Sequence, residues 1–235
     1  MLATGKQKDK LIVALDGDSL EHAARLVDLL KSEVKNFKVG MQLFTACGPD
    51  AIKMVQAHGG KVFLDLKYHD IPSTVSKAVY TAAKLKVAMI NVHATGGRKM
   101  MAESLAAAED ATGGKPPLII GVTVLTSMES LGDIGIQYEI REQVLRLARL
   151  TQEVGLHGVL ASPLEIQPIR QVCGKKFLIV TPGIRPAGMH LDDQARISSP
   201  KQAIQAGADF LVIGRPITES KDPLAVVKNI LKEMA

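Results

Sequence analysis

The sequence is poor in cysteine and in aromatic residues. Its two cysteines, Cys47 and Cys173, are too few and too far apart for a disulfide framework, a zinc site or a redox CxxC pair. A reducing cytoplasmic location is therefore the simplest expectation. Aromatic residues make up only 3% of the chain and tryptophan is absent, so nucleic-acid bases would find few rings to stack on. We expect no nucleic-acid partner.

Long hydrophobic runs are also missing. The longest, at residues 118–125, is far shorter than the roughly 18 residues that cross a membrane. Residues 1–10 are basic but have no apolar core behind them, which excludes a signal peptide and predicts a flexible tail. No linker rich in Pro, Gly or Ser interrupts the remainder, so we expect one domain over residues 11–235 and no membrane partner.

The charge balance is mildly positive. The chain of 235 residues has 29 Lys and Arg against 24 Asp and Glu, a formal net charge of +5. Since 46% of the residues are hydrophobic and 23% are charged, the composition is that of an ordinary globular protein. The excess charge is spread along the chain, and it fits an anionic small-molecule substrate.

Short aliphatic runs, apolar nearly throughout, alternate with helix-like segments. The runs occupy residues 11–15, 37–40, 61–67, 89–94, 118–125, 158–162, 177–183 and 210–215. Helices are predicted at residues 20–30 after a Ser19 cap, from Pro72 onward, and at residues 139–154. Continuous apolar strands are typical of a parallel sheet buried on both faces. Eight β-then-α units favour an α/β fold, a single (β/α)8 TIM barrel, over an open doubly wound sheet.

Active sites of such barrels lie at the C-terminal ends of the strands. Polar residues that follow the apolar runs are therefore the candidates for function. They are Asp16, Lys38, Asp65, Lys67, Asp70, His93, Thr126, Ser127, Ser162, residues 182–185, Gly214 and Arg215.

The sharpest motif is DLKYHD at residues 65–70. The two-residue period of a strand places Asp65 and Lys67 on one face, and barrel closure brings Asp16 and Lys38 to the same mouth. Opposite charges about 4 Å apart attract by roughly 4 kcal/mol at an effective dielectric constant near 20. Alternating signs would keep Lys67 charged and able to donate a proton. The alternatives are a structural salt bridge and, for Asp16 within DGDS, a turn or cap.

Two glycine-arginine loops indicate a phosphate site. Arg215 follows Gly214 and precedes Pro216, which is expected at the first position of a short helix, and TPGIRP at residues 181–186 lies on the neighbouring loop. In barrels this site commonly follows strands 7 and 8. Residues 187–200 are expected to form a lid from which Gln194 reaches the phosphate. An ordinary turn is the alternative.

A metal or cofactor is not expected. His93 is interpreted as a hydrogen-bonded core residue in preference to a base or metal ligand. Asp16, Asp65 and His93 would share their space with the ammonium groups of Lys38 and Lys67, which disfavours a divalent ion. The sequence also has no Walker A loop, Rossmann glycine pattern or HExxH motif.

From residue 11 to the C-terminus the chain resembles the orotidine 5′-phosphate decarboxylase family. The likeness rests on LIVALD, FKVG, FLDLKYHDIPSTV, VTVLTSM, TPGIRP, DQARI and VIGRPIT, all in the family order. The resemblance implies a homodimeric barrel that converts orotidine 5′-phosphate to UMP and CO2 without a cofactor, in the last step of UMP synthesis. The active sites would lie at the dimer interface.

The resemblance also implies roles for individual residues. Lys67 would protonate C6 of the pyrimidine within a charged network of Lys38, Asp65, Lys67 and Asp70. Asp70, Ile71 and Thr74 would enter the site of the partner subunit. Other substrate contacts would come from Asp16 and Lys38 at the ribose, Thr126 or Ser127 at the pyrimidine, and Pro182, Arg185, Gln194, Gly214 and Arg215 toward the phosphate.

Two other functions compete with this interpretation. Sugar-phosphate decarboxylases of similar fold share DxKxxD but use Mg2+ with an acidic residue on the second strand, where this chain has Lys38; a ribulose-phosphate epimerase would need metal-binding His and Asp there. A non-enzymatic UMP-binding barrel would keep Gly214 and Arg215 but would have no use for the alternating charges.

Overall fold

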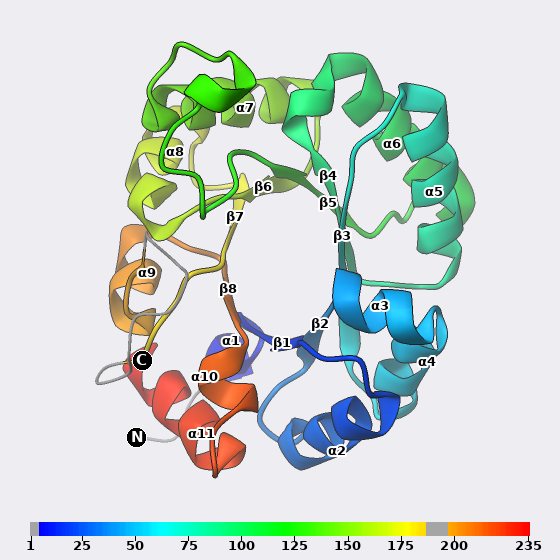
Figure 1. Cartoon of the computed structure of the whole chain (residues 1–235), viewed down its shortest axis with the longest axis vertical. Coiled ribbons are helices and arrows are strands. Elements are labelled where there is room, and N and C mark those ends of the chain that lie inside the picture. Colours follow the sequence, from blue (N-terminus) through cyan, green and yellow to red (C-terminus); the bar gives the residue numbers. More distant parts are fainter. Residues whose placement is uncertain (1–4, 187–196) are drawn as a thin grey trace.

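The computed structural model describes residues 5–186 and 197–235. Its eight strands are all parallel and close into a barrel in chain order (Figure 1). This arrangement confirms the predicted (β/α)8 fold. The strands are β1 Leu11–Leu15, β2 Asn36–Gly40, β3 Lys61–Tyr68, β4 Met89–His93, β5 Leu118–Val122, β6 Gly158–Leu160, β7 Leu178–Thr181 and β8 Phe210–Ile213.

Helices surround the barrel on its outside (Figure 1). The helices of the described residues are α1 Gly5–Lys8, which precedes β1, followed by α2 Leu20–Leu30, α3 Met41–Cys47, α4 Asp50–Ala57, α5 Pro72–Lys84, α6 Gly97–Thr112, α7 Ile140–Val154, α8 Ile166–Cys173, α9 Pro200–Ala206, α10 Arg215–Thr218 and α11 Pro223–Glu233. Short 3-10 turns occur at η1 Ala94–Gly96, η2 Gly132–Ile134 and η3 Pro163–Glu165. Within the described part of the chain, no helix combines the length and the apolar character needed to cross a bilayer.

The predicted helix boundaries are close to the observed ones. The Ser19 hydroxyl caps α2 by accepting a hydrogen bond from the backbone N–H of His22, at 3.2 Å. Pro72 begins α5, as predicted. Glu139 is the N-cap of α7 and not its first helical residue.

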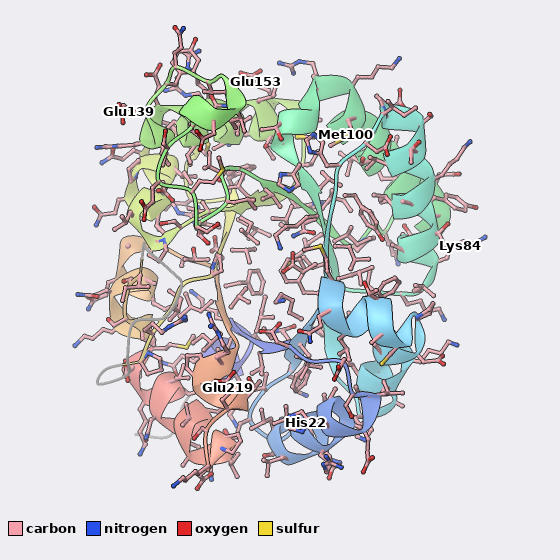
Figure 2. All side chains as sticks on the ribbon, in the orientation of Figure 1. His22, Lys84, Met100, Glu139, Glu153 and Glu219 are labelled. Atoms are coloured by element: carbon pink, nitrogen blue, oxygen red, sulfur yellow. The ribbon has the colours of Figure 1, made fainter. Side chains whose placement is uncertain are left out.

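Most strand residues are buried, on both faces of the sheet. On β1, Ile12 and Ala14 belong to an apolar cluster inside the barrel, whereas Leu11, Val13 and Leu15 pack in the larger cluster that includes the surrounding helices. Figure 2 shows side chains filling the space that the strands enclose, while Lys84 on α5 points outward. The two layers explain why the strand sequences are apolar without alternation.

The structure describes the predicted tail, residues 1–10, from residue 5 onward. Residues 5–8 form the single turn α1, and the Lys8 ammonium lies 2.7 Å from the Glu33 carboxylate. The carbonyl of Lys10 accepts a hydrogen bond from the N–H of Leu211 on β8. These polar contacts attach the segment to the barrel. Residues 1–4 lie outside the described range.

We expect Gly158→Ala to destabilise the barrel. Gly158 pairs with Leu178 across β6 and β7, and a Cβ atom at residue 158 would lie 2.2 Å from the Leu178 carbonyl oxygen. Overpacking of this kind typically costs about 1–3 kcal/mol in the free energy of unfolding. Urea denaturation measures it. Gly132→Ala is the control, because the added Cβ would meet its nearest neighbour, Ser130 Oγ, only at 3.4 Å. Equal stability of the two variants would contradict this packing.

Candidate active site

A cavity opens at the C-terminal ends of the strands. It is lined by residues from strands and from the loops that follow them, which are far apart in the sequence but meet at one end of the barrel. The predicted site residues that line it are Asp16, Lys38, Asp65, Lys67, Thr126, Pro182, Arg185, Gly214 and Arg215. Gln194 lies outside the described residues.

Strand register explains how Lys38 reaches this cavity. Ala14, Lys38 and Phe63 are neighbours across β1, β2 and β3. Ala14 and Phe63 both belong to the inner apolar cluster. Since residues in register point to the same face of a sheet, the Lys38 side chain starts inside the barrel.

Four charged side chains form a chain of alternating sign in the cavity. Lys67 Nζ lies 2.7 Å from Asp65 Oδ1, and Lys38 Nζ lies 3.3 Å from Asp65 Oδ2. Lys38 Nζ also lies 3.4 Å from Asp16 Oδ1. Each ammonium therefore neighbours a carboxylate, as the sequence predicted for these residues. The alternation offsets repulsion between like charges held close together.

Asp65 is the buried centre of this charge chain. Its side chain is only 6% exposed, against 23% for that of Lys67. Burial is the largest single influence and raises the pKa of Asp65. Lys38, Lys67 and a hydrogen bond from Asn91 each lower this pKa, and together they outweigh burial. The net shift is downward, so Asp65 remains a carboxylate at neutral pH.

Backbone geometry at Lys67 departs from the simple alternation that the sequence predicted. Lys67 has φ +50°, in the left-handed region that residues other than glycine rarely occupy. Leu64 pairs with Ile90 and Tyr68 with Val92, so three residues of β3 stand opposite one residue of β4. Asp65 and Lys67 still meet, but through an irregular strand end. Such strain commonly occurs at functional sites.

Sequence reasoning missed Asn91, the residue opposite this irregularity. Asn91 is fully buried on β4, and its Nδ2 donates a hydrogen bond to Asp65 Oδ1 at 2.7 Å. Its Oδ1 accepts the backbone N–H of Lys67 at 2.9 Å. The available signal was a polar amide within the otherwise apolar run MINV.

Two glycines give the charged groups room. A Cβ on Gly214, just after β8, would lie 2.6 Å from Asp16 Oδ2. One on Gly40, at the end of β2, would lie 2.8 Å from Lys38 Nζ. Because any larger side chain would displace these groups, the glycines permit the close approach of Asp16 and Lys38.

The two arginine loops line the same cavity. The Arg185 side chain is largely buried, and its backbone N–H donates to the Ser198 carbonyl at 2.9 Å. Gly214 is the N-cap of α10, which makes Arg215 the first helical residue and Pro216 the second. The sequence predicted Pro216 as the first helical residue, but the helix begins one residue earlier, at Arg215.

Thr126 and Ser127 are separated by the structure. Thr126 is buried and lines the cavity. Ser127 is exposed and does not line it. The turn after β5 thus brings only Thr126 to the charged groups.

Asp70, Ile71 and Thr74 lie outside the cavity. They are exposed where β3 passes into α5, and the Asp70 carboxylate accepts the backbone N–H of Ile71 at 2.6 Å. Ile71 is 64% exposed. Met41, which directly follows β2, is 55% exposed. The fold of this chain does not bring these three residues to the cavity.

His93 lies beside the site as half of a stacked pair. Its ring centroid is 5.1 Å from that of His69. Burial, followed by His69 and Lys67, lowers the pKa of His93 to about 4. His93 is therefore neutral at physiological pH. In residues 5–186 and 197–235, no group of three His, Cys, Asp or Glu side chains is arranged to hold a metal ion.

Comparisons with known proteins agree with this geometry. The sequence profile described as "Orotidine 5'-phosphate decarboxylase / HUMPS family" matches residues 9–230. The chain is 52% identical to the orotidine 5′-phosphate decarboxylase of Syntrophotalea carbinolica, covering 97% of this chain and 96% of that protein. It is 50% identical to the enzyme of the same name from Pelobacter propionicus, over 97% and 95%. The crystal structure of orotidine 5′-phosphate decarboxylase from Lactobacillus acidophilus aligns with a TM-score of 0.85 at 38% identity, covering 96% of this chain and 99% of that one.

The lowered pKa of His93 predicts a pH-dependent stability. The folded protein keeps His93 neutral down to about pH 4, whereas the unfolded chain binds a proton below its ordinary value of 6.5. The free energy of unfolding should therefore decrease as the pH falls from 6.5 toward 4. His93→Asn should weaken this decrease, measured by urea denaturation at several pH values. His22→Asn, at an exposed position on α2, is the control and should keep the wild-type slope. An unchanged slope in His93→Asn would refute the assignment.

Proposed function

This chain belongs to the orotidine 5′-phosphate decarboxylase / HUMPS family, and we propose that it converts orotidine 5′-phosphate to UMP and CO2 in pyrimidine biosynthesis. The observation that carries the proposal is the alternating charge chain at the cavity, with the Lys67 ammonium 2.7 Å from Asp65. Lys38 on the second strand favours this reaction over those of sugar-phosphate enzymes that place a metal-binding acid there. The proposed location is the cytoplasm.

Lys67 is the proposed proton donor. When the bond between C6 and the carboxylate breaks, CO2 leaves and the electron pair stays on C6 as a vinyl carbanion. No conjugated group accepts that pair, so the site must stabilise it electrostatically. The Lys67 ammonium supplies a positive charge there and transfers one proton from Nζ to C6. This step gives UMP and leaves a neutral amine, which regains a proton from solvent.

The remaining cavity residues are assigned to substrate binding. Thr126 contacts the pyrimidine, and Asp16 with Lys38 contacts the ribose. Pro182, Arg185, Gly214, Arg215 and Gln194 hold the phosphate end. Guanidinium groups suit this role because they bind phosphate oxygens through charge-assisted hydrogen bonds. Binding energy gained at the phosphate can then stabilise the transition state at C6.

The proposed reaction uses no metal or cofactor. The Lys38 ammonium lies between the carboxylates of Asp16 and Asp65, where a divalent cation would otherwise bind, and the Lys67 ammonium contacts the other oxygen of Asp65. A cation placed there would be repelled by both lysines. These lysines supply the positive charge that the reaction needs.

We further propose a homodimer in which Asp70, Ile71 and Thr74 complete the site of the partner subunit. All three are exposed and lie outside the cavity of their own subunit. Ile71 is apolar and 64% exposed, so its burial in an interface would remove apolar surface from water. Asp70 would extend the alternating charges by approaching Lys67 of the other chain.

Replacement of Lys67 tests the proposed chemistry. We expect Lys67→Ala to lower kcat by more than about a thousandfold, because both the cation and the proton are lost. Affinity for UMP should stay within about tenfold, since the phosphate contacts remain. The loss of orotidine 5′-phosphate absorbance measures turnover. Lys53→Ala on α4, where the side chain is 68% exposed, is the matched control and should retain full activity.

The same absorbance assay separates the competing interpretations. Wild-type turnover should be unchanged in EDTA, whereas an enzyme that needs Mg2+ would lose activity. Decarboxylation by Lys67→Ala at the wild-type rate would eliminate the proton-donor role. A wild-type protein that binds UMP without turning over orotidine 5′-phosphate would support the non-enzymatic alternative.

Mixed dimers test whether Asp70 serves the partner's site. Lys67→Ala and Asp70→Ala should each be nearly inactive alone. A hybrid dimer of the two has one site with both wild-type residues only if Asp70 acts across the interface. Random mixing should then restore about a quarter of wild-type activity, because half of the dimers are hybrids and each has one intact site of two. Co-expression of the two chains with different tags, followed by the absorbance assay, measures this gain. No recovery in isolated hybrids would place Asp70 in its own subunit's site.

A further inference from the structure

We propose that Asn91 is a positioning residue, which fixes the Asp65 carboxylate and the Lys67 backbone and thereby directs the Lys67 ammonium. The inference rests on the proposed decarboxylation. It adds to that reaction a neutral side chain that does not line the cavity and that acts through Asp65 and Lys67.

Packing alone does not explain an amide at this position. Asn91 follows Met89 by two residues on β4, and Met89 belongs to the apolar cluster inside the barrel. Residues two apart on a strand face the same side, so an apolar residue is expected at 91. Instead the amide is fully buried. Leaving such a group unpaired is unfavourable, and its two hydrogen bonds to Asp65 and Lys67 avoid that cost.

The first hydrogen bond fixes the orientation of Asp65. Asp65 Oδ1 accepts from both Lys67 Nζ and Asn91 Nδ2, each at 2.7 Å, while Oδ2 faces Lys38. The two lysine side chains are long and flexible, whereas the Asn91 side chain is short and fully buried. Asn91 is therefore the rigid donor of the three. Because it is neutral, it orients the carboxylate without disturbing the alternation of charge.

The second hydrogen bond supports the unusual backbone of Lys67. The left-handed conformation at φ +50° is unfavourable for a residue other than glycine. The β3–β4 register breaks between Leu64 and Tyr68, and the Lys67 N–H donates to Asn91 Oδ1 within that break. A side-chain acceptor thus compensates for the interrupted backbone ladder. One amide thereby holds both ends of the Asp65–Lys67 pair.

Two substitutions of Asn91 separate these contacts from general stability. Asn91→Leu keeps the approximate size but removes both hydrogen bonds, and it should lower kcat about a hundredfold through misplacement of the ammonium. KM and UMP affinity should change by only a few fold. Hydrogen exchange at the Lys67 amide should become at least tenfold faster in Asn91→Leu, because its acceptor is gone. This exchange measurement does not depend on substrate or activity.

Asn91→Asp tests positioning through the pH dependence of kcat, which would not change if Asn91 only stabilised the fold. The introduced carboxyl keeps an acceptor for the Lys67 N–H, but it donates to Asp65 only when it is protonated. Once ionised, it repels the Asp65 carboxylate. The ratio of its kcat to that of the wild type should therefore fall as the pH rises, whereas the ratio for Asn91→Leu should stay constant. Its Lys67 amide should remain protected from exchange.

Thr151→Val is the matched control for the loss of a buried hydrogen bond. Thr151 is fully buried on α7, and its hydroxyl donates to the Leu147 carbonyl at 2.7 Å. This variant should lose stability but retain kcat and the wild-type pH profile.

The inference and the proposed function fail in different ways. Three results would each overturn the positioning role: a wild-type kcat in Asn91→Leu, unchanged exchange at the Lys67 amide, or a pH-independent kcat ratio for Asn91→Asp. The proposed reaction would still stand if the wild-type protein turns over orotidine 5′-phosphate. An inactive wild-type protein would instead refute the reaction, and the Lys67 exchange rates would still report whether Asn91 holds the Lys67 backbone. If Asn91→Leu does not fold, the near-isosteric Asn91→Asp carries the test alone.

Discussion

The candidate site depends on one buried carboxylate held between two ammonium groups. Burial of Asp65 favours its neutral form, but Lys38 and Lys67 lie within 3.3 Å and reverse that preference. Removal of either lysine would leave a buried charge without one of its partners, which is strongly unfavourable in a poorly solvated site. The same attraction limits where the Lys67 ammonium can lie. Stability of the ion pairs and positioning of the proposed proton donor are thus one physical constraint.

The barrel divides its cavity between two kinds of chemistry. The ends of β1 to β3 supply the charged side chains, and β4 supports them through Asn91. The loops after β5, β7 and β8 supply a hydroxyl and two guanidinium groups around the remaining wall. Adjacent strands therefore hold adjacent parts of one proposed substrate. The glycines at 40 and 214 matter because they let the charged half approach the backbone closely.

The similarity of this chain to known proteins extends over the whole fold and is not confined to a motif. The matches cover nearly the full length of this chain and of the orotidine 5′-phosphate decarboxylases to which it is similar. Within so broad a family the charge of a single side chain separates the proposed chemistries. A lysine on the second strand contributes a cation directly, whereas an acid there would need a metal ion to supply it.

The sequence by itself determined the barrel and the residue types at its mouth. Apolar runs are local features, and eight such runs in order are compatible with few folds. Helix starts are local as well, and α2 and α5 begin where Ser19 and Pro72 predicted. The sequence also placed Asp16, Lys38, Asp65 and Lys67 at one rim. Only the tertiary structure decided which groups touch: it selected Thr126 over Ser127, paired His69 with His93, bent the Lys67 backbone and set Asn91 opposite it. Those outcomes depend on register and hydrogen bonds between separate strands, which the periodicity of a single strand does not encode.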